Sequence, residues 1–334
     1  MKRVLLTGAS GFIGAHTLRH ILKNTDWEVV CLTTFTHKGL QDRIKYAVSG
    51  IDDDFSRVKV IICDLSSPIS KLTSNQFGKI DYVINIASES HVDRSIENPA
   101  PFIINNVSLI CNILDWARVQ DIEKFLHIST DEVYGPYKDH ESVEWDLHLP
   151  SNPYSASKAA QEDIAYAYWR TFDVPIAITN TMNIIGESQA SEKYTPLVIK
   201  KILNNESLDV HTYSNGKIGL RSWLYARNKS DALLHVLNTD FTKYGSSDKL
   251  DKWNIVGDKE YNNLEWAQKI SEIMSKPLKY SLVDSSHSRP GYDSKYSLDN
   301  TKLLESGWRA PFDLDESLEK TVNWYLQNPD WLNI

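Results

Sequence analysis

The opening of the chain constrains the fold most. Residues 7–14 read Thr-Gly-Ala-Ser-Gly-Phe-Ile-Gly and directly follow the apolar run Val4–Leu6. Glycines at three-residue spacing permit a tight turn, close approach of the backbone to a phosphate, and tight packing of the next helix on the strand. The amino end of that helix would face the phosphate charge. The pattern therefore predicts a dinucleotide site, with Gly8, Gly11, Phe12, Ile13 and Gly14 at the cofactor, rather than a glycine-rich turn without a ligand.

Strand-like and amphipathic helical stretches alternate through the first half of the chain. Strands are expected at Val4–Leu6, Glu28–Leu32, Val58–Cys63, Tyr82–Ile86, Phe125–Ile128 and Ile176–Asn180. Helices are expected at Ile13–Lys23, Pro101–Gln120 and Tyr154–Phe172. This alternation predicts the α/β class, with a Rossmann-type, doubly wound parallel sheet.

The second half is less regular and predicts a smaller, interleaved α/β domain. Helices are expected at Thr195–Asn204, Leu264–Met274 and Asp315–Gln327, and an extended stretch at Pro277–Pro290. Asn228–Leu237 is expected to return to the first domain. The predicted division is a dinucleotide-binding domain over 1–180, joined by 223–256, and a substrate domain over 181–222 and 257–334.

Composition limits the class of protein. The chain has 334 residues, of which 41% are hydrophobic, enough for one large domain or two joined ones. The net charge of −8 argues against general binding to nucleic acid or membrane surfaces. Three cysteines fit reduced thiols better than a disulfide framework. An immediate first strand leaves no room for a signal peptide, so we expect a cytoplasmic protein. We also expect no metal site.

The adenosine end of the predicted site leaves the cofactor open between NAD and NADP. The acidic residue usual after the second strand, which would repel a 2′-phosphate, is replaced by Thr33. Basic residues follow at His37, Lys38 and Arg43. NADP is therefore not excluded, although these side chains could simply be solvated beside NAD. Asp64 could accept from the adenine amino group or cap its own turn, and Leu65 and Ala87 are further expected contacts.

Tyr154 and Lys158 form a candidate oxidising couple. Four-residue spacing presents both side chains on one face of a helix. A phenol is a poor base at neutral pH, but a nearby ammonium together with an oxidised nicotinamide stabilises its anion and lowers the phenol pKa. Lys158 could also hold the nicotinamide ribose. A Tyr and a Lys on a helix surface would be the ordinary alternative, but the upstream glycine turn favours the catalytic interpretation.

Asp131 and Glu132 imply more chemistry than hydride transfer. They follow the strand Phe125–Ile128 at its carboxyl end, where ligands bind in open parallel sheets. Neighbouring carboxyl groups disfavour double ionisation, so one is pushed toward its acid form while the other can act as a base. In isolation such a pair would be a helix cap beside a solvated acid.

These motifs together resemble the extended short-chain dehydrogenase/reductases, specifically the nucleotide-sugar 4,6-dehydratases of the dTDP-glucose type. The resemblance runs nearly end to end. It covers Thr7–Gly14, Glu89–Ser95, Ile128–Gly135, Pro153–Lys158, Glu192-Lys193 with Pro196-Leu197, Trp223–Tyr225 and Arg289–Gly291.

The resemblance implies a three-step reaction at one site. Tyr154 takes the proton of the sugar 4-hydroxyl while hydride leaves C4, with Thr130 bonded to the C4 oxygen. Glu132 removes the C5 proton, and protonated Asp131 donates to the departing C6 hydroxyl. Hydride then returns to C6, which leaves a 4-keto-6-deoxy sugar. NAD is the default cofactor of this family.

The resemblance also implies the residues that hold the substrate. Arg221 and Arg289 match positions that clamp the diphosphate, for which a planar guanidinium is suited. The other expected contacts are Ser90, Thr130, Asn183, Lys193 and Tyr292. Departures from the family pattern occur at Thr33, Ser222, Tyr292 and the stretch 209–220. They surround the nucleotide-sugar pocket and the adenosine end, so they leave the base of the nucleotide open.

Two other functions stay open, together with the oligomeric state. A nucleotide-sugar 4-epimerase or uronate decarboxylase would use the oxidising pair but would not need both acids. A non-catalytic dinucleotide-binding protein would need none of these residues together. The helices Pro101–Gln120 and Tyr154–Phe172 match the pair that forms a four-helix bundle between subunits in the superfamily, so a homodimer is expected. Their apolar residues include Ile110, Ile113, Leu114, Ile164, Tyr168 and Trp169.

Overall fold

A single parallel sheet of seven strands organises the computed structural model, which describes residues 1–36, 39–53, 55–137, 139–213, 216–241, 248–284 and 295–333. The strand order is β10-β6-β5-β4-β1-β2-β3, and every neighbouring pair is parallel. The strands are β1 (Arg3–Thr7), β2 (Glu28–Thr33), β3 (Val58–Ile62), β4 (Tyr82–Asn85), β5 (Lys124–Ile128), β6 (Ile176–Thr181) and β10 (Asp251–Ile255). The order of the strands reverses between β1 and β4, and in sheets of this kind ligands bind beyond the carboxyl ends of the strands at such a reversal.

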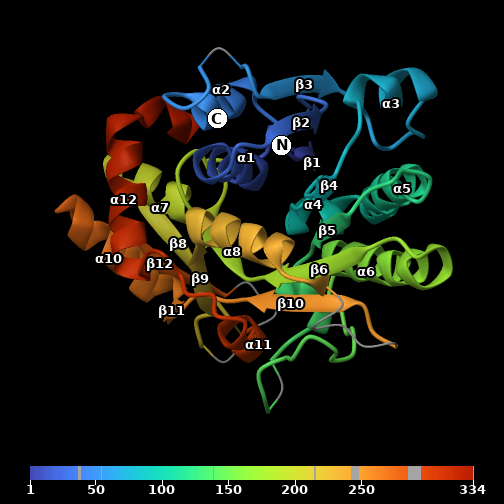
Figure 1. The fold of residues 1–334 in the computed structure, drawn as a ribbon. Coiled ribbons are helices and arrows are strands. Elements are labelled where there is room, and N and C mark those ends of the chain that lie inside the picture. Colours follow the sequence, from blue (N-terminus) through green and yellow to red (C-terminus); the bar gives the residue numbers. More distant parts are fainter. Residues whose placement is uncertain are drawn as a thin grey trace.

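Helices cover both faces of this sheet (Figure 1). One face packs against α1 (Phe12–Asn24), α2 (Gln41–Val48) and α8 (Ala226–Asn238). The other packs against α3 (Lys71–Phe77), α5 (Pro99–Ala117) and α6 (Pro153–Phe172). A short helix, α4 (Val92–Glu97), precedes α5. Burial on both faces explains why the strands are continuous apolar runs and not alternating ones.

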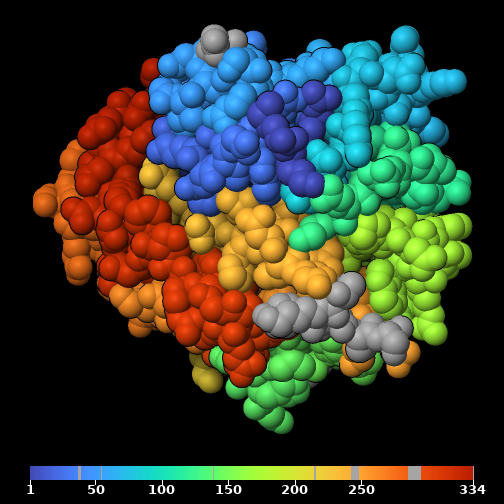
Figure 2. All heavy atoms as spheres, viewed as in Figure 1, coloured from blue at the N-terminus to red at the C-terminus, as the bar shows by residue number. Residues whose placement is uncertain are grey.

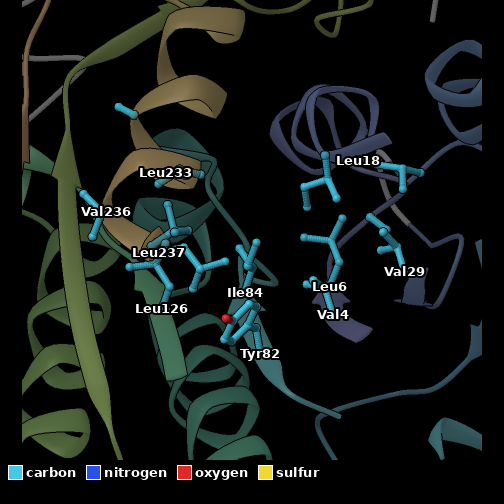
Figure 3. Packing of buried hydrophobic residues seen from close by; sticks show 14 of the residues in the cluster. Val4, Leu6, Leu18, Val29, Tyr82, Ile84, Leu126, Leu233, Val236 and Leu237 are labelled. Atoms are coloured by element: carbon cyan, nitrogen blue, oxygen red, sulfur yellow. The ribbon is translucent and has the colours of Figure 1, made fainter. Parts of the chain in front are cut away.

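The return of α8 to the first part of the chain is visible in its core contacts. Leu233, Val236 and Leu237 of α8 join Ile84 and Leu126 of the sheet in one buried cluster (Figure 3). Burying each of these side chains stabilises the fold by roughly 1.5–3 kcal/mol. Strand β10 follows and adds the seventh strand beside β6, so residues far apart in sequence complete one sheet.

A smaller second part has its own sheets and core. Strands β7 (Asn183–Ile185), β9 (Leu220–Tyr225) and β11 (Glu260–Asn262) form one sheet, and β8 (Ser207–Thr212) pairs with β12 (Lys279–Asp284) in another. Helices α7 (Tyr194–Leu203), α10 (Asn263–Met274), α11 (Thr301–Glu305) and α12 (Leu314–Gln327) flank them. Trp223 stacks on Trp266 within this core, with 4.5 Å between the ring centroids.

The predicted elements agree with the structure to within a few residues at their ends. The extended stretch predicted at Pro277–Pro290 is strand β12 as far as Asp284, and the remainder lies outside the described residues. Strand β9 belongs to the three-stranded sheet with β7 and β11. Strand β10 belongs to the seven-stranded sheet, and α8 packs on one face of that sheet. The chain therefore crosses between the two parts near Tyr225.

The C-terminal segments pack directly on the N-terminal ones. In Figure 2 the red C-terminal region lies against the blue region of α1 and α2, beside the gold surface of α8. Ring contacts join the two ends, with Tyr46 of α2 6.0 Å from Trp324 of α12. No helix in the described part of the chain has the length and apolar content needed to cross a membrane.

Candidate active site

The glycine turn after β1 has the geometry of a phosphate cradle. Gly8 has φ +67°, and a Cβ added there would lie 3.0 Å from the backbone nitrogen of Ala87. A Cβ on Gly14 would lie 2.1 Å from the Gly8 carbonyl oxygen, so only glycine fits where α1 crosses the turn. Gly11 is the residue before α1 and makes no side-chain cap, which leaves first-turn amides of Phe12 and Ile13 available to an anion.

The expected cofactor contacts share one edge of the sheet. Thr33 ends β2, Leu65 and Asp64 follow β3, and Ala87 follows β4, all at the carboxyl ends of parallel strands. Thr33 is buried, and its hydroxyl is hydrogen bonded to Ser10 of the glycine turn. The Asp64 carboxylate accepts from the Ser66 amide at 2.9 Å, which is the turn-capping role that the sequence left open. His37 and Lys38 lie outside the described residues.

The acid pair begins a short 3-10 helix, η1 (Asp131–Tyr134), directly after β5. Thr130 caps this helix, because its hydroxyl accepts from the Glu132 amide at 3.4 Å and donates to Asp131 Oδ1 at 2.9 Å. Asn152 Nδ2 donates to Glu132 Oε2 at 3.1 Å. Asn152 also caps α6 by accepting from the Ser155 amide at 2.9 Å, so one side chain contacts both Glu132 and the helix that carries Tyr154 and Lys158.

Burial makes both acids retain protons more strongly than usual. Burial raises the pKa of Asp131 to about 6, although its bond from Thr130 and the charge of Arg221 oppose the shift. Burial and the neighbouring Asp131 charge raise the pKa of Glu132 to about 7, against the bond from Asn152 and the charges of Arg221 and Lys193. The carboxyls therefore titrate as a coupled pair near neutral pH, as an acid and a base for one elimination require.

Tyr154 and Lys158 lie on the first two turns of α6, as predicted. The Tyr154 phenol lies beside Thr130, which favours its anion, and the Tyr154 backbone nitrogen donates to Ser95 Oγ at 3.1 Å. Burial, followed by the Glu132 and Asp131 charges, raises the pKa of Tyr154 above its usual value. In the protein without cofactor, burial and the two carboxylates therefore disfavour the phenolate. The expected lowering of the phenol pKa, which also requires an oxidised nicotinamide, stays a prediction.

Lys158 is almost fully buried and carries its own constraints. Its Nζ donates to the Ile128 carbonyl at 2.8 Å and to Gln161 Oε1 at 2.5 Å. Burial lowers the pKa of Lys158 to about 7, while the charge of Glu162 opposes that shift. The amine is thus held at the end of β5, within the crevice where the acid pair begins.

Sequence reasoning missed a buried polar network below this couple. Glu162 lies one turn after Lys158 and forms an ion pair with Lys252 of β10 at 2.6 Å, with both side chains at most 3% exposed. Asn180 Nδ2 joins it to the site, because it donates to Glu162 Oε1 at 2.6 Å and to the Thr130 carbonyl at 2.9 Å. The four-residue spacing of 154, 158 and 162 was a usable signal for Glu162, whereas nothing in the sequence indicated Lys252.

Basic residues of the second part face the acid pair. Arg221 of β9 is 4% exposed, and its charge acts on both Asp131 and Glu132. Lys193 acts on Glu132, and its Nζ donates to the Ser90 carbonyl at 3.4 Å. Asn183 begins β7 beside Trp223 of β9. The structure therefore brings Thr130, Asp131, Glu132, Tyr154, Arg221 and Lys193 to one crevice, while Arg289 and Tyr292 lie outside the described residues.

This site belongs to the class of Rossmann-fold enzymes that combine a dinucleotide cradle with a Tyr–Lys couple. The sequence comparisons give the family. Residues 4–248 match the model of the NAD dependent epimerase/dehydratase family. The chain belongs to that family.

Individual relatives cover the whole chain. It is 35% identical to the low-salt glycan biosynthesis protein Agl12 of Haloferax volcanii, over 97% of this chain and 98% of that protein. It is 35% identical to the dTDP-glucose 4,6-dehydratase of Haemophilus influenzae, over 98% of this chain and 99% of that protein. The crystal structure of DesIV, a dTDP-glucose 4,6-dehydratase from Streptomyces venezuelae with NAD bound, superposes with a TM-score of 0.86 at 27% identity, over 98% of each chain.

Proposed function

We propose that this protein is a nucleotide-sugar 4,6-dehydratase that converts an NDP-hexose, with dTDP-glucose as the first candidate, to the NDP-4-keto-6-deoxyhexose. The single observation that carries the proposal is the coupled acid pair, Asp131 and Glu132, beside Tyr154 at the carboxyl end of β5. The names of the full-length relatives support it, since several are dTDP-glucose 4,6-dehydratases.

The glycine turn and Lys158 fit a dinucleotide, and NAD is the proposed one. It would lie on Gly8, Gly11 and Gly14, with Lys158 at the nicotinamide ribose. When bound, NAD supplies the acceptor that takes hydride from C4 and later returns it to C6, together with the positive charge of its oxidised ring. The buried Thr33 offers no carboxylate against a 2′-phosphate, so the proposal extends to NADP as a second cofactor.

The residues of the chain divide the remaining work. Tyr154 takes the proton of the 4-hydroxyl, and Thr130 donates to the C4 oxygen. Glu132 then removes the C5 proton, which the new C4 ketone has acidified, and Asp131 donates a proton to the departing C6 hydroxyl. When hydride returns to C6, Glu132 gives a proton back to C5, after exchange of that proton with solvent. The two carboxyls titrate together, so the order of their pKa values without substrate does not assign these roles.

Charge complementarity supports the proposed substrate class. Arg221 and Lys193 would hold the diphosphate, with Ser90 and Asn183 beside them, and Arg289 and Tyr292 would complete the contacts. Without the anionic substrate, the charge of Arg221 favours the ionised forms of Asp131 and Glu132, and the charge of Lys193 favours that of Glu132. A diphosphate bound by these two residues would relieve the acids of that charge, which favours their protonated forms.

The domain division and the oligomeric state complete the proposal. We infer a dinucleotide-binding domain over 1–180 joined by 226–256, a substrate domain over 181–225 and 257–334, and a cytoplasmic homodimer. The boundary is moved from 223 to 226 because Trp223–Tyr225 of β9 pair with β7 of the second part. Helices α5 and α6 support the dimer, because Ile104 is 63% and Phe172 46% exposed, and Ile164, Tyr168 and Trp169 are half-buried. Ile110, Ile113 and Leu114 lie in the core instead.

Turnover in deuterated water tests the function. The protein and NAD would be incubated separately with the glucose nucleotides of thymine, uracil, cytosine and guanine, and the products analysed by mass spectrometry and NMR. A 4,6-dehydratase yields a product that has lost one water and carries deuterium at C5. A 4-epimerase product retains the C6 oxygen and the C5 proton, and that result would replace the proposal. No product from any of the four would remove it.

A further inference from the structure

A strained bend links two parts of the proposed substrate site. Residues 186–189 lie between Asn183 of β7 and Lys193, the residue directly before α7. Ser188 has φ +64°, a conformation that side-chain-bearing residues seldom adopt. A Cβ on Gly186 would lie 3.0 Å from Ala226 Cβ and 3.3 Å from the Phe12 ring, so the bend presses against α1 and α8. Such strain persists only where the surroundings fix the backbone.

Three successive backbone carbonyls of this bend accept hydrogen bonds from three different helices. His16 Nε2 of α1 donates to the Glu187 carbonyl at 2.9 Å. Arg43 Nε of α2 donates to the Ser188 carbonyl at 2.9 Å, and Tyr325 Oη of α12 donates to the Gln189 carbonyl at 2.7 Å. Helices from both ends of the chain therefore hold the same three peptide groups.

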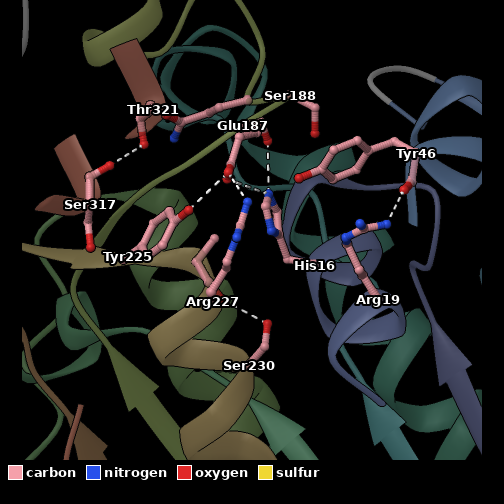
Figure 4. Close-up of polar contacts among 12 residues, drawn as sticks. His16, Arg19, Tyr46, Glu187, Ser188, Tyr225, Arg227, Ser230, Ser317 and Thr321 are labelled. Atoms are coloured by element: carbon pink, nitrogen blue, oxygen red, sulfur yellow. Dashed lines mark hydrogen bonds and ion pairs between the residues drawn. The ribbon is translucent and has the colours of Figure 1, made fainter. Parts of the chain in front are cut away.

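The Glu187 carboxylate lies at the centre of these contacts (Figure 4). It is 2% exposed, it accepts from Tyr225 Oη at 2.9 Å, and it forms an ion pair with Arg227. Its second oxygen is 3.9 Å from His16 Nε2. The charges of His16 and Arg227 hold the pKa of Glu187 below its usual value despite the opposing effect of burial. The carboxylate is thus a buried anion shared by α1, the end of β9 and α8.

The elements that meet at Glu187 are those that would carry the two ligands. Helix α1 begins at the glycine turn, and β9 carries Arg221 four residues before Tyr225. We propose that Glu187 is a positioning residue for the sugar-nucleotide site. Its carboxylate fixes the bend 186–189, and the bend in turn fixes the positions of Asn183 and Lys193 relative to Arg221. This inference rests on the proposed function. We call Glu187, His16, Tyr225 and Arg227 the Glu187 clasp.

The clasp predicts a specific division of kinetic effects. None of its residues hydrogen bonds to the acid pair, Tyr154 or Lys158 among the described contacts, so hydride transfer and elimination at saturating substrate should persist. Loosening the bend lets Asn183 and Lys193 leave their bound positions, which weakens substrate binding. Glu187→Gln retains the size of the side chain and removes its charge. We expect KM for the sugar nucleotide to rise roughly tenfold while kcat changes less than about twofold.

Two variants separate this role from a general loss of stability. Tyr225→Phe removes one donor to Glu187 and should raise KM in the same direction by a smaller factor. Asp251→Asn is the matched control, since Asp251 is an equally buried carboxylate bonded to Lys302 and Trp253 at the opposite end of the sheet. It should lower the melting temperature but leave KM unchanged.

Hydrogen exchange measured by mass spectrometry tests the clasp without any substrate. Peptides covering 183–197 should exchange at least severalfold faster in Glu187→Gln than in the unmodified protein or Asp251→Asn, whereas peptides from α5 and α6 should not. Unchanged exchange in 183–197 overturns the clasp whatever the enzyme does. Faster exchange with unchanged KM removes its role in substrate binding. Failure of the unmodified protein to dehydrate any sugar nucleotide removes the proposed function instead, and leaves the exchange result to decide the clasp.

Discussion

Replacing Asp131 by Asn should stabilise the protein at neutral pH while it disables elimination. Asp131 is 5% exposed, and its Oδ2 has no hydrogen-bond partner in the described part of the chain. Burial raises the pKa of this carboxyl from 3.8 to about 6. Because the folded protein binds this proton more tightly than the unfolded chain, the contribution of Asp131 to the free energy of unfolding is greatest below pH 3.8 and is lost as the pH rises from there through about 6.

The size of the effect follows from that shift. A difference of about 2 pKa units corresponds to about 3 kcal/mol at 1.36 kcal/mol per unit. Asn has no charge to desolvate and can still accept the bond from Thr130 at its oxygen. The gain in free energy of unfolding for Asp131→Asn should therefore approach about 3 kcal/mol at pH 8 and shrink toward zero near pH 4. A variant that is more stable but inactive would show that the buried carboxyl needed for activity lowers the free energy of unfolding.

Urea unfolding at pH 4, 6 and 8, followed by tryptophan fluorescence, measures this gain. Asp315→Asn is the control, because ion pairs with Lys259 and Lys269 hold the pKa of that exposed carboxyl below its usual value. Removing this carboxylate should lower the free energy of unfolding by less than about 1 kcal/mol at pH 8, whereas Asp131→Asn should raise it. An Asp131→Asn protein that is no more stable than the parent at pH 8, or equally stabilised at every pH, refutes the reasoning.

Three further outcomes test the site. Tyr154→Phe should abolish reduction of bound NAD, followed by the near-ultraviolet absorbance of dihydronicotinamide, and retained reduction would remove Tyr154 as the base. The double variant Asp131→Asn with Glu132→Gln should still oxidise C4 but leave the cofactor reduced, so normal turnover would contradict the acid–base assignment. Glu162→Gln should lose about 3–5 kcal/mol of unfolding free energy at pH 7, because Lys252 keeps a buried charge without its partner. A loss below about 1 kcal/mol in urea unfolding would show that Glu162 does not compensate the buried charge of Lys252.

The order of elements was readable from the sequence, because each signal for them is local. The glycine turn at 8–14 and the apolar runs that become β1 to β6 depend on residues within one strand–turn–helix unit. The spacing of Tyr154 and Lys158 likewise requires only the period of one helix. The full-length similarity to the family then implied the acid pair's position beside them.

Tertiary structure decided what depends on contacts between distant segments. Lys252 reaches Glu162, which lies 90 residues earlier in the chain, only because β10 joins the sheet beside β6. The raised pKa values of Asp131, Glu132 and Tyr154 come from burial, which the identity of a residue does not encode. Glu187 carried no sequence signal at all. Its neighbours His16, Tyr225 and Arg227 meet it only in the folded chain, where the cost of a buried charge depends on every element that surrounds it.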